Sequence, residues 1–275
     1  MIVTRFAPSP TGHLHLGSAY SALFAHETAR STGGRFLLRI ENIDAGRCRP
    51  EHERALIEDL AWLGLRWEEP VRRQSEHMPE YRACLAKLDA LGVLYPCFCT
   101  RADIAQAASA PHGGEPIYPG TCRGLTREES ARRIAEGRPY ALRLDAAKAL
   151  ARTGQLEWRD RARGTFTVEL ADDVVLARKD IGTSYHLAVT LDDHIQGVSL
   201  VTRGEDLLPA THVHRVLQAL LGLGMPDWHH HRLLHDDSGE RLAKRKESIS
   251  IKQLRDAGET PATVIARLGL SIDFS

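Results

Sequence analysis

The chain has 275 residues and a mass of 30.5 kDa, and its 36 Lys and Arg balance its 36 Asp and Glu. A hydrophobic share of 43% and a charged share of 26% are ordinary for a globular protein, which excludes a largely disordered chain. The zero net charge excludes a protein that coats a polyanion through many unpaired cations, but it is compatible with a local basic groove. The length allows one large domain or two ordinary ones.

The N-terminal residues 1–8 lack the basic segment and apolar stretch of a secretory signal. No run in the chain approaches the ~18 apolar residues that a membrane span requires. We therefore expect a cytoplasmic protein without a membrane partner. Two of the five cysteines, Cys48 and Cys84, are isolated, and we expect them to be packing or surface residues.

The first ninety residues alternate between strand-like and helix-like patterns. This alternation is typical of a mostly parallel sheet with helices on its faces. Strands are predicted at 2–6 and 35–41, and helices at 18–30, from Pro50 through Leu63, and at 79–91.

Residues 93–180 have a different pattern, which we interpret as an insertion with its own small core. A capping box is predicted at Thr126 and Glu129. Short strand-like runs follow near 139–144, 165–170 and 174–178.

The alternation then resumes toward the C-terminal end. Strands are predicted at 185–191 and 198–202, followed by a helix at 209–221. Ser250 and Thr260 are predicted to begin helices in the tail.

Two segments indicate a nucleotide site, although the chain has neither a P-loop nor a GxGxxG motif. Between the first strand and the first helix, small residues allow close approach of a ligand, and the helix N-terminus offers free N–H groups. His13 and His15 lie in this segment and can donate hydrogen bonds to phosphate. Residues 241–246 form a basic loop suited to phosphate. Each segment alone is most simply a turn or a solvated loop; together they favour a nucleotide site.

Four segments in order carry a family resemblance. RFAPSPTG at 5–12 with HLGS at 15–18 resembles the HIGH region of the glutamyl-type class I aminoacyl-tRNA synthetases. RIENID at 39–44 resembles their second-strand motif, with Asn42 in place of an acidic residue, and 185–194 resembles their later strand and turn. RLAKR at 241–245 stands where their KMSKS loop belongs, with Arg241 and Ala243 as departures.

The resemblance implies an α/β fold: a Rossmann-like class I catalytic domain with a zinc-containing insertion and a short C-terminal helical segment. It implies these parts: a first catalytic half at 1–92, a zinc-binding, tRNA-contacting insertion at 93–180, a second catalytic half at 181–235, and the KMSKS-like loop with C-terminal helices at 236–275.

The resemblance also implies an ATP-dependent ligase that forms glutamyl-adenylate and releases pyrophosphate, with magnesium accompanying the ATP. His15 and Lys244 are the implied catalytic residues. Arg5 and Arg203 would pair with the carboxylates of L-glutamate, and Glu41 would accept from its ammonium group. The implied ATP-binding residues are Pro8, Thr11, Gly12, His13, His15, Gly17, Ser18, Arg241, Leu242, Ala243, Lys244 and Arg245. The implied glutamate-binding residues are Arg5, Phe6, Ala7, Pro8, Ser9, Glu41, Tyr185 and Arg203.

Within this family, the chain resembles the short branch that transfers glutamate to queuosine in the anticodon loop of tRNA(Asp). About thirty residues follow Lys246, too few for an anticodon-binding domain, so we expect none. Val189 stands where the full-length synthetases usually carry Asn. We expect a monomer whose partners are L-glutamate, ATP and queuosine-containing tRNA(Asp), which it contacts through a local basic surface.

The remaining cysteines suggest a metal site. Cys97 and Cys99 are followed, after twenty-two intervening residues, by Cys122, and three thiolates need a fourth ligand for a closed zinc site. Ligand chemistry nominates His112, whereas the resemblance nominates Tyr118 from a Tyr-x-x-x-Cys segment. We expect one structural zinc held by the three cysteines and Tyr118; the alternative is three buried free thiols.

Three other functions remain open from the sequence. The first is a minimal glutamyl-tRNA synthetase that charges the acceptor end of its tRNA. The second is a non-catalytic RNA-binding relative, which the altered residues 241–243 favour. The third is another HIGH-type ligase resembling pantothenate synthetase, against which the set Arg5, Glu41, Tyr185 and Arg203 argues.

Overall fold

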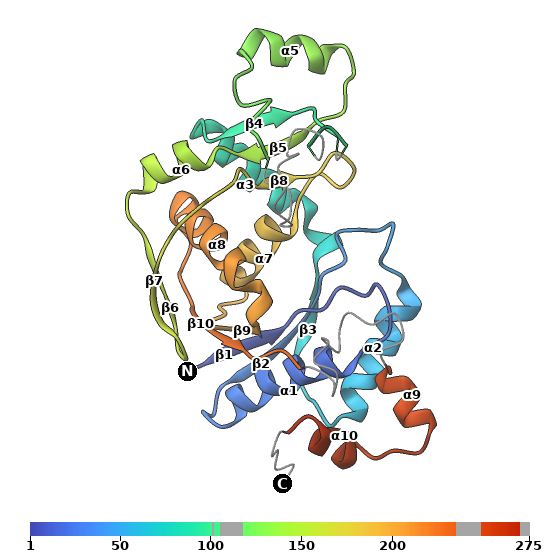
Figure 1. The fold of residues 1–275 in the computed structure, drawn as a ribbon. Coiled ribbons are helices and arrows are strands. Elements are labelled where there is room, and N and C mark those ends of the chain that lie inside the picture. The colour runs from blue at the N-terminus through green and yellow to red at the C-terminus, as the bar shows by residue number, and fades with distance from the viewer. Residues whose placement is uncertain (101, 105–117, 235–248, 270–275) are drawn as a thin grey trace, which may run out of the picture.

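A parallel sheet forms the central layer (Figure 1). Strand β1 pairs in parallel with β2, and β2 pairs in parallel with β3. On the other side of β1 lies β9, where the Ser199 amide donates to the Val3 carbonyl at 3.0 Å, and β9 pairs in parallel with β10. The resulting order, β3-β2-β1-β9-β10, places the carboxyl ends of β1 and β9 side by side. The bounds are β1 Val3–Phe6, β2 Arg35–Ile40, β3 Glu68–Arg73, β9 Leu200–Gly204 and β10 Asp227–His231.

The structure is a computed structural model that describes residues 1–100, 102–104, 118–234 and 249–269. Within these residues, no helix combines the length and the apolar character needed to cross a membrane.

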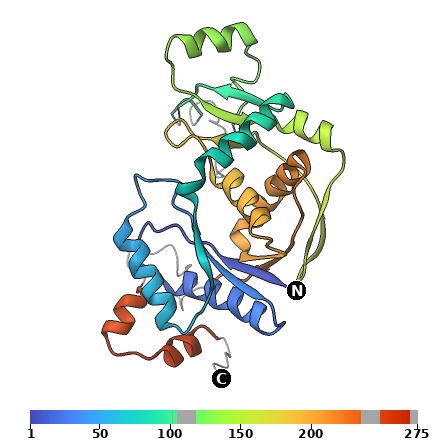
Figure 2. The same ribbon diagram turned by 180° about the vertical axis from the view of Figure 1, so that it is seen from behind.

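Helices cover both faces of the central sheet because its strands are apolar on both sides. Along β2, Phe36, Leu38 and Ile40 pack into the core with helices α1, α2, α9 and α10. Leu37 points to the opposite face, where it joins the core with α3, α7 and α8. Figure 2 shows the two helical layers from behind. Their bounds are α1 Leu16–Arg30, α2 Pro50–Trp62, α3 Met78–Ala90, α7 Tyr185–Ile195, α8 Leu208–Leu221, α9 Ile251–Asp256 and α10 Pro261–Arg267.

Most predicted elements are confirmed within a few residues. They are the two N-terminal strands, the first three helices, the strand near 198–202 and the helix at 209–221. Ser250 caps α9 and Thr260 caps α10, as predicted. Cys84 is buried and Cys48 half-buried, as expected of isolated cysteines.

The predicted strand at 185–191 is wrong, because this segment is helix α7. Ser184 caps it by accepting a hydrogen bond from the Leu187 amide. Residues from Leu187 through Asp193 are all buried, so the apolar run carries no period that separates a helix from a strand.

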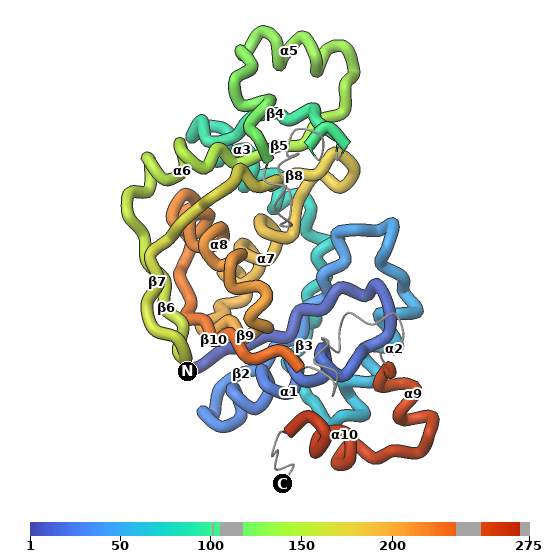
Figure 3. Tube along the Cα trace, in the orientation of Figure 1, coloured from blue at the N-terminus to red at the C-terminus, as the bar shows by residue number. Residues whose placement is uncertain are grey.

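Residues 93–180 divide between two parts of the molecule. Strands β4, β5 and β8 form a separate antiparallel sheet near α5, above the central sheet in Figure 3. By contrast, β6 pairs in parallel with β10 and extends the central sheet, with β7 antiparallel beside it. The bounds are β4 Leu94–Cys97, β5 Ala141–Leu144, β6 Glu157–Asp160, β7 Gly164–Thr167, β8 Val175–Ala177, α5 Arg127–Ala135 and α6 Ala146–Thr153.

The core of this segment is likewise shared. Leu144 and Trp158 belong to the same apolar cluster as α3, α7 and α8. A small cluster around Tyr95, Phe98 and Tyr118 is separate. The predicted capping box at Thr126 is present at the start of α5.

The C-terminal helices are attached to the segment that precedes α1. The Ile251 amide donates to the Leu14 carbonyl at 2.7 Å, and a β-bridge joins His15 to Ser250. Arg255 on α9 also forms an ion pair with buried Asp59 on α2 at 3.2 Å.

The core beneath α1 and α2 generates a stability prediction. Leu60 has no exposed surface, so Leu60→Ala should lower the free energy of unfolding by about 2–5 kcal/mol through lost burial and a residual cavity. Urea denaturation measures the change. The exposed Arg54→Ala on the same helix is the control and should stay within about 0.5 kcal/mol; equal losses in the two variants would contradict the assignment of Leu60 to the core.

Candidate active site

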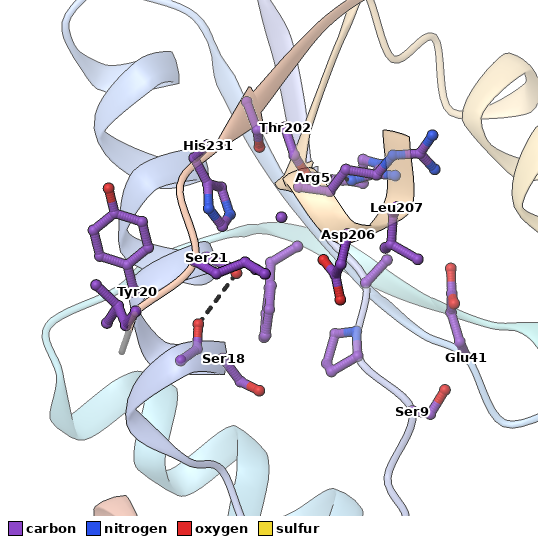
Figure 4. A pocket seen from close by; sticks show the side chains of 18 of the residues that line it. Arg5, Ser9, Ser18, Tyr20, Ser21, Glu41, Thr202, Asp206, Leu207 and His231 are labelled. Atoms are coloured by element: carbon purple, nitrogen blue, oxygen red, sulfur yellow. Dashed lines mark hydrogen bonds between the residues drawn. The ribbon is translucent and has the colours of Figure 1, made fainter. Parts of the chain in front are cut away.

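A cavity of about 460 Å³ opens at the carboxyl ends of β1 and β9, beside the first turn of α1. Parallel sheets of this kind present their ligand sites at this edge. Figure 4 shows Glu41 and Ser9 toward one end of the cavity, with Ser18, Tyr20 and His231 toward the other. The lining residues are Arg5, Phe6, Ala7, Pro8, Ser9, Gly17, Ser18, Tyr20, Ser21, Glu41, Tyr185, Thr202, Arg203, Gly204, Asp206, Leu207, His231, Arg232, Leu233 and Leu234.

The structure brings all eight predicted glutamate-binding residues to this one cavity, from β1, the end of β2, α7 and β9. Of the predicted ATP-binding residues, Pro8, Gly17 and Ser18 also line it. Thr11 lines a smaller neighbouring cavity of about 100 Å³, which shares Ser9, Glu41 and Tyr185 with the first.

The other predicted ATP-binding residues lie elsewhere or outside the described residues. Gly12, His13 and His15 do not line the large cavity. His13 instead contacts His52 of α2, with ring centroids 5.5 Å apart, and His15 occupies the position before α1. Arg241, Leu242, Ala243, Lys244 and Arg245 lie outside the described residues, as does His112.

Asp193 of α7 holds together two arginines from different strands. Its Oδ1 accepts from Arg5 Nε at 3.0 Å and from Arg39 Nη1 at 2.8 Å. All three side chains are at most 8% exposed. Burial would raise the pKa of Asp193, but Arg5 and Arg39 outweigh it and lower that pKa. The carboxylate therefore stays ionised and orients Arg5 at the cavity wall.

Asp192 performs a parallel role deeper in the protein. It is fully buried, and its two oxygens accept from Arg72 of β3, Gln74 and Tyr81 at 2.8 to 2.9 Å. Consecutive residues of α7 thus bind side chains from β1, β2, β3 and α3. Asn42 binds a backbone group instead: its Oδ1 accepts a hydrogen bond from the Ser75 amide at 2.9 Å.

Glu41 supplies a carboxylate to the cavity at the end of β2. Its Oε1 lies 3.2 Å from Arg39 Nη2. Burial raises the pKa of Glu41, and the guanidinium groups of Arg39 and Arg5 offset this only in part. An ammonium group brought into the cavity would therefore find a desolvated acceptor at Glu41.

Arg203 differs from Arg5 and Arg39 because its hydrogen-bond partners among the described residues are neutral. Its guanidinium donates to Tyr185 Oη at 3.2 Å, Thr211 Oγ1 at 2.6 Å and His230 Nε2 at 3.2 Å, and His214 Nδ1 lies 3.3 Å away. It is 5% exposed, and burial lowers its pKa. A buried cation whose direct partners carry no charge favours an anionic ligand.

Several residues of the site had no role predicted from the sequence. Asp193 orients Arg5, while Thr202, Asp206 and His231 line the cavity. The adjacent acidic pair Asp192 and Asp193 inside the 185–194 segment was the available signal. The other residues had no such signal, because only the strand order places β9 beside β1 and β10 beside β9.

Three cysteines form a second candidate site away from the cavity. The Sγ atoms of Cys97, Cys99 and Cys122 all lie within 4.8 Å of one another. Tyr118 Oη lies 3.4 Å from Cys97 Sγ and accepts from the Cys122 amide at 2.8 Å. Converging thiols at these separations suit a tetrahedral metal ion, so the group can hold a metal.

A parallel Rossmann-like sheet with a cavity at the carboxyl ends of its strands is the architecture of a nucleotide-binding catalytic domain. Residues 1–273 match the family of class I tRNA synthetases (E and Q), catalytic domain. The chain is 48% identical to the glutamyl-Q tRNA(Asp) synthetase of Rhodobacter capsulatus, over 98% of this chain and 100% of that one. It is 38% identical to a glutamate–tRNA ligase of Coprothermobacter proteolyticus, over 99% of this chain and 59% of that one.

A solved structure of a glutamate tRNA ligase has a similar fold. The glutamate tRNA ligase from Elizabethkingia meningosepticum, in complex with its amino acid, superposes with a TM-score of 0.74 at 29% identity, over 94% of this chain and 53% of that one. The chain belongs to the class I tRNA synthetases of the E and Q type, in the family of the glutamyl-Q tRNA(Asp) synthetases. It is thus a ligase of the synthetase class. The family match does not support the alternative of a ligase resembling pantothenate synthetase.

The paired arginines generate a second stability prediction. Asp193→Asn should lower the free energy of unfolding at pH 7 by about 3–5 kcal/mol, because Arg5 and Arg39 lose their shared buried anion. Chemical denaturation measures the change. Asp180→Asn breaks an exposed pair with Arg178 and should cost at most about 1 kcal/mol. A loss at position 193 no larger than this control would contradict the role given to Asp193.

Proposed function

We propose that the protein activates L-glutamate with ATP and transfers the glutamyl group to queuosine in the anticodon loop of tRNA(Asp). One observation carries the choice of amino acid: buried Arg203 faces the cavity with neutral hydrogen-bond partners, beside Arg5 and opposite a desolvated Glu41. Two guanidinium groups and one carboxylate match the two carboxylates and one ammonium of glutamate. Uncharged or basic side chains would leave a buried arginine unpaired.

The residues divide the work along the cavity. Arg5 and Arg203 bind the carboxylates, and Glu41 accepts from the ammonium group; Ser9 and Tyr185 complete this end. Arg5 keeps one N–H on Nη1 and one on Nη2 for a ligand, because the Thr202 carbonyl and Asp193 each take only one hydrogen from these nitrogens, while Asp193 also takes the single hydrogen of Nε.

The other end of the cavity suits the nucleotide. Gly17 and Ser18 lie in the first turn of α1, whose free N–H groups favour phosphate. His15 and Lys244 are proposed to contact the triphosphate, and magnesium accompanies the ATP, held mainly by its phosphates.

The proposed first step forms one bond and breaks one. An α-carboxylate oxygen of glutamate attacks the α-phosphorus of ATP, and the bond to pyrophosphate breaks, which leaves glutamyl-adenylate. The residues named act by positioning and by charge stabilisation, without a covalent enzyme intermediate. A hydroxyl of queuosine then attacks the activated carbonyl, and AMP leaves.

The choice of acceptor rests on the relatives. Proteins named glutamyl-Q tRNA(Asp) synthetase match at 42% to 48% identity, with 82% to 100% of their length covered. Two relatives named glutamate–tRNA ligase match at 38%, with 57% to 59% covered. These matches support queuosine over the terminal adenosine as the acceptor.

Transfer of labelled glutamate tests this function. Queuosine-containing tRNA(Asp) should be labelled, whereas the same tRNA without queuosine and tRNA(Glu) should not. In glutamate-dependent ATP–pyrophosphate exchange, Arg203→Gln should raise the KM for glutamate by at least about 30-fold, because a buried charged hydrogen-bond partner is lost. Equal labelling of modified and unmodified tRNA(Asp) would refute queuosine as the acceptor.

We further propose that Cys97, Cys99, Cys122 and Tyr118 hold one structural zinc ion, which fixes the end of β4 to the segment that begins at Tyr118. The mutual approach of the three thiols supports this proposal. The metal would contribute to folding and would not contact the reacting atoms.

Metal analysis of the purified protein checks the proposal. About one zinc per chain is expected, with its loss in Cys97→Ser because one of the converging thiolates is removed. Cys84→Ser is the matched control, since Cys84 is a buried cysteine remote from this cluster, and it should keep the metal. Metal-free wild-type protein with unchanged thermal stability under a chelator would refute the site.

A further inference from the structure

We propose that Asp160 and His230 are positioning residues: Asp160 sets the tautomer of His230, and His230 thereby fixes the Arg203 guanidinium before the amino acid arrives. This inference deepens the proposed function, on which it rests for the identity of the ligand. Asp160 ends β6, His230 lies in β10 and Arg203 in β9, so the three side chains run across neighbouring strands of one sheet.

The hydrogen bonds around Asp160 keep it ionised, so toward His230 it can act only as an acceptor. The carboxylate is 1% exposed, and its Oδ1 accepts the amides of Ala162 and Arg163 at 2.9 and 3.0 Å. Oδ2 accepts the backbone amide of His230 at 2.9 Å and lies 2.7 Å from Nδ1 of the same residue. Burial would raise the pKa of Asp160, but these donors outweigh it and lower that pKa. An ionised carboxylate at 2.7 Å requires the proton on Nδ1.

The other imidazole nitrogen is then an acceptor, and it faces Arg203. His230 Nε2 accepts from Arg203 Nε at 3.2 Å and lies 3.2 Å from Thr211 Oγ1. Thr211 in turn accepts from Arg203 Nη2 at 2.6 Å, so its own hydrogen is free to point to His230 Nε2. Two nitrogens of the guanidinium are therefore held by a closed set of hydrogen bonds that exists only in the Nδ1–H tautomer.

The third nitrogen of Arg203 is held in the same way from α8. Nη1 lies 3.3 Å from His214 Nδ1, which must accept, so His214 carries its proton on Nε2 and points it at His186 Nδ1, 3.2 Å away. Burial lowers the pKa of His186 and of His230 to about 4 and that of His214 well below its usual value. All three imidazoles are thus neutral at pH 7.

The arrangement orients Arg203 without neutralising it. A carboxylate in direct contact would orient the guanidinium equally well, but it would compete with the carboxylate of the ligand. Asp160 supplies its negative charge one imidazole away from the guanidinium. Such preorganisation of a charged donor removes reorganisation from the binding step.

The change Asp160→Asn separates this role from a purely structural one. The asparagine oxygen would stay with the amides of Ala162 and Arg163, and its NH2 group would face His230 Nδ1 and, as donor against donor, the His230 backbone amide. An NH2 donor beside His230 Nδ1 favours the tautomer of His230 that carries its proton on Nε2. That N–H would then face the N–H of Arg203 Nε, so two donors would oppose each other. Asp145→Asn is the matched control, because Asp145 is also a buried carboxylate that accepts a backbone amide, that of Lys148, and asparagine caps helices equally well.

Two measurements test the inference. In ATP–pyrophosphate exchange, Asp160→Asn should raise the KM for glutamate about 10-fold or more, with kcat and the KM for ATP changed less than about 2-fold. Asp145→Asn should leave all three constants unchanged. Nitrogen-15 NMR of the imidazoles, with the His230 signals assigned by their absence in His230→Gln, should show the Nδ1–H tautomer in the wild type and the Nε2–H tautomer in Asp160→Asn.

The outcomes separate this inference from the proposed function. Wild-type protein without glutamate-dependent exchange would refute the proposed function, while the NMR measurement would still decide the tautomer. An Nε2–H tautomer of His230 in the wild type would overturn the inference, even if Asp160→Asn failed to fold. So would a folded Asp160→Asn protein whose KM for glutamate stays within about 2-fold of the wild type.

Discussion

The ion pairs of Asp192 and Asp193 are the constraint on which the rest of the site depends. These adjacent residues of α7 bind Arg5 of β1, Arg39 of β2 and Arg72 of β3. Charges this deeply buried cost several kcal/mol each in lost hydration, so they are tolerable only while every partner is in place. The register of three strands and the position of one helix are therefore coupled, and the cavity forms where they meet.

This coupling distributes charge unevenly around the cavity. Arg5 and Arg39 share a carboxylate, and Arg39 also reaches Glu41. Arg203, only one strand away from Arg5, is instead surrounded by a tyrosine, a threonine and two neutral imidazoles. Arg5 therefore reaches the cavity wall already paired with a carboxylate, whereas Arg203 reaches it with neutral hydrogen-bond partners among the described residues.

Much of the site could be predicted from the sequence because short motifs lie at strand ends. The carboxyl ends of neighbouring parallel strands meet at one edge of the sheet, which explains why Arg5, Glu41 and Arg203 converge. Tyr185 lines the same cavity from the first turn of α7. His13 is an ATP-binding candidate both by its chemistry and by the family resemblance. His13 can donate to phosphate, yet it packs against His52 of α2.

Other features could not be obtained from local patterns. The run from Leu187 through Asp193 is buried at every position, and such a run has no period that distinguishes a helix from a strand. Strand β6 lies far from β10 in the sequence, and nothing before the pairing itself links Asp160 to His230. Side-chain partners separated by seventy residues are decided by strand order, which composition and spacing do not specify.

The sequence by itself determined the elements with clear periodicity or caps, the family resemblance and the candidate residues for glutamate, ATP and a metal. Only the tertiary structure decided which of these residues share a cavity, which arginines have a carboxylate partner, and which hydrogen-bond partners each buried imidazole meets. The physical reason is that residue type and helix or strand preference are local properties. Burial and hydrogen-bond partnership depend on segments that meet only after the chain has folded.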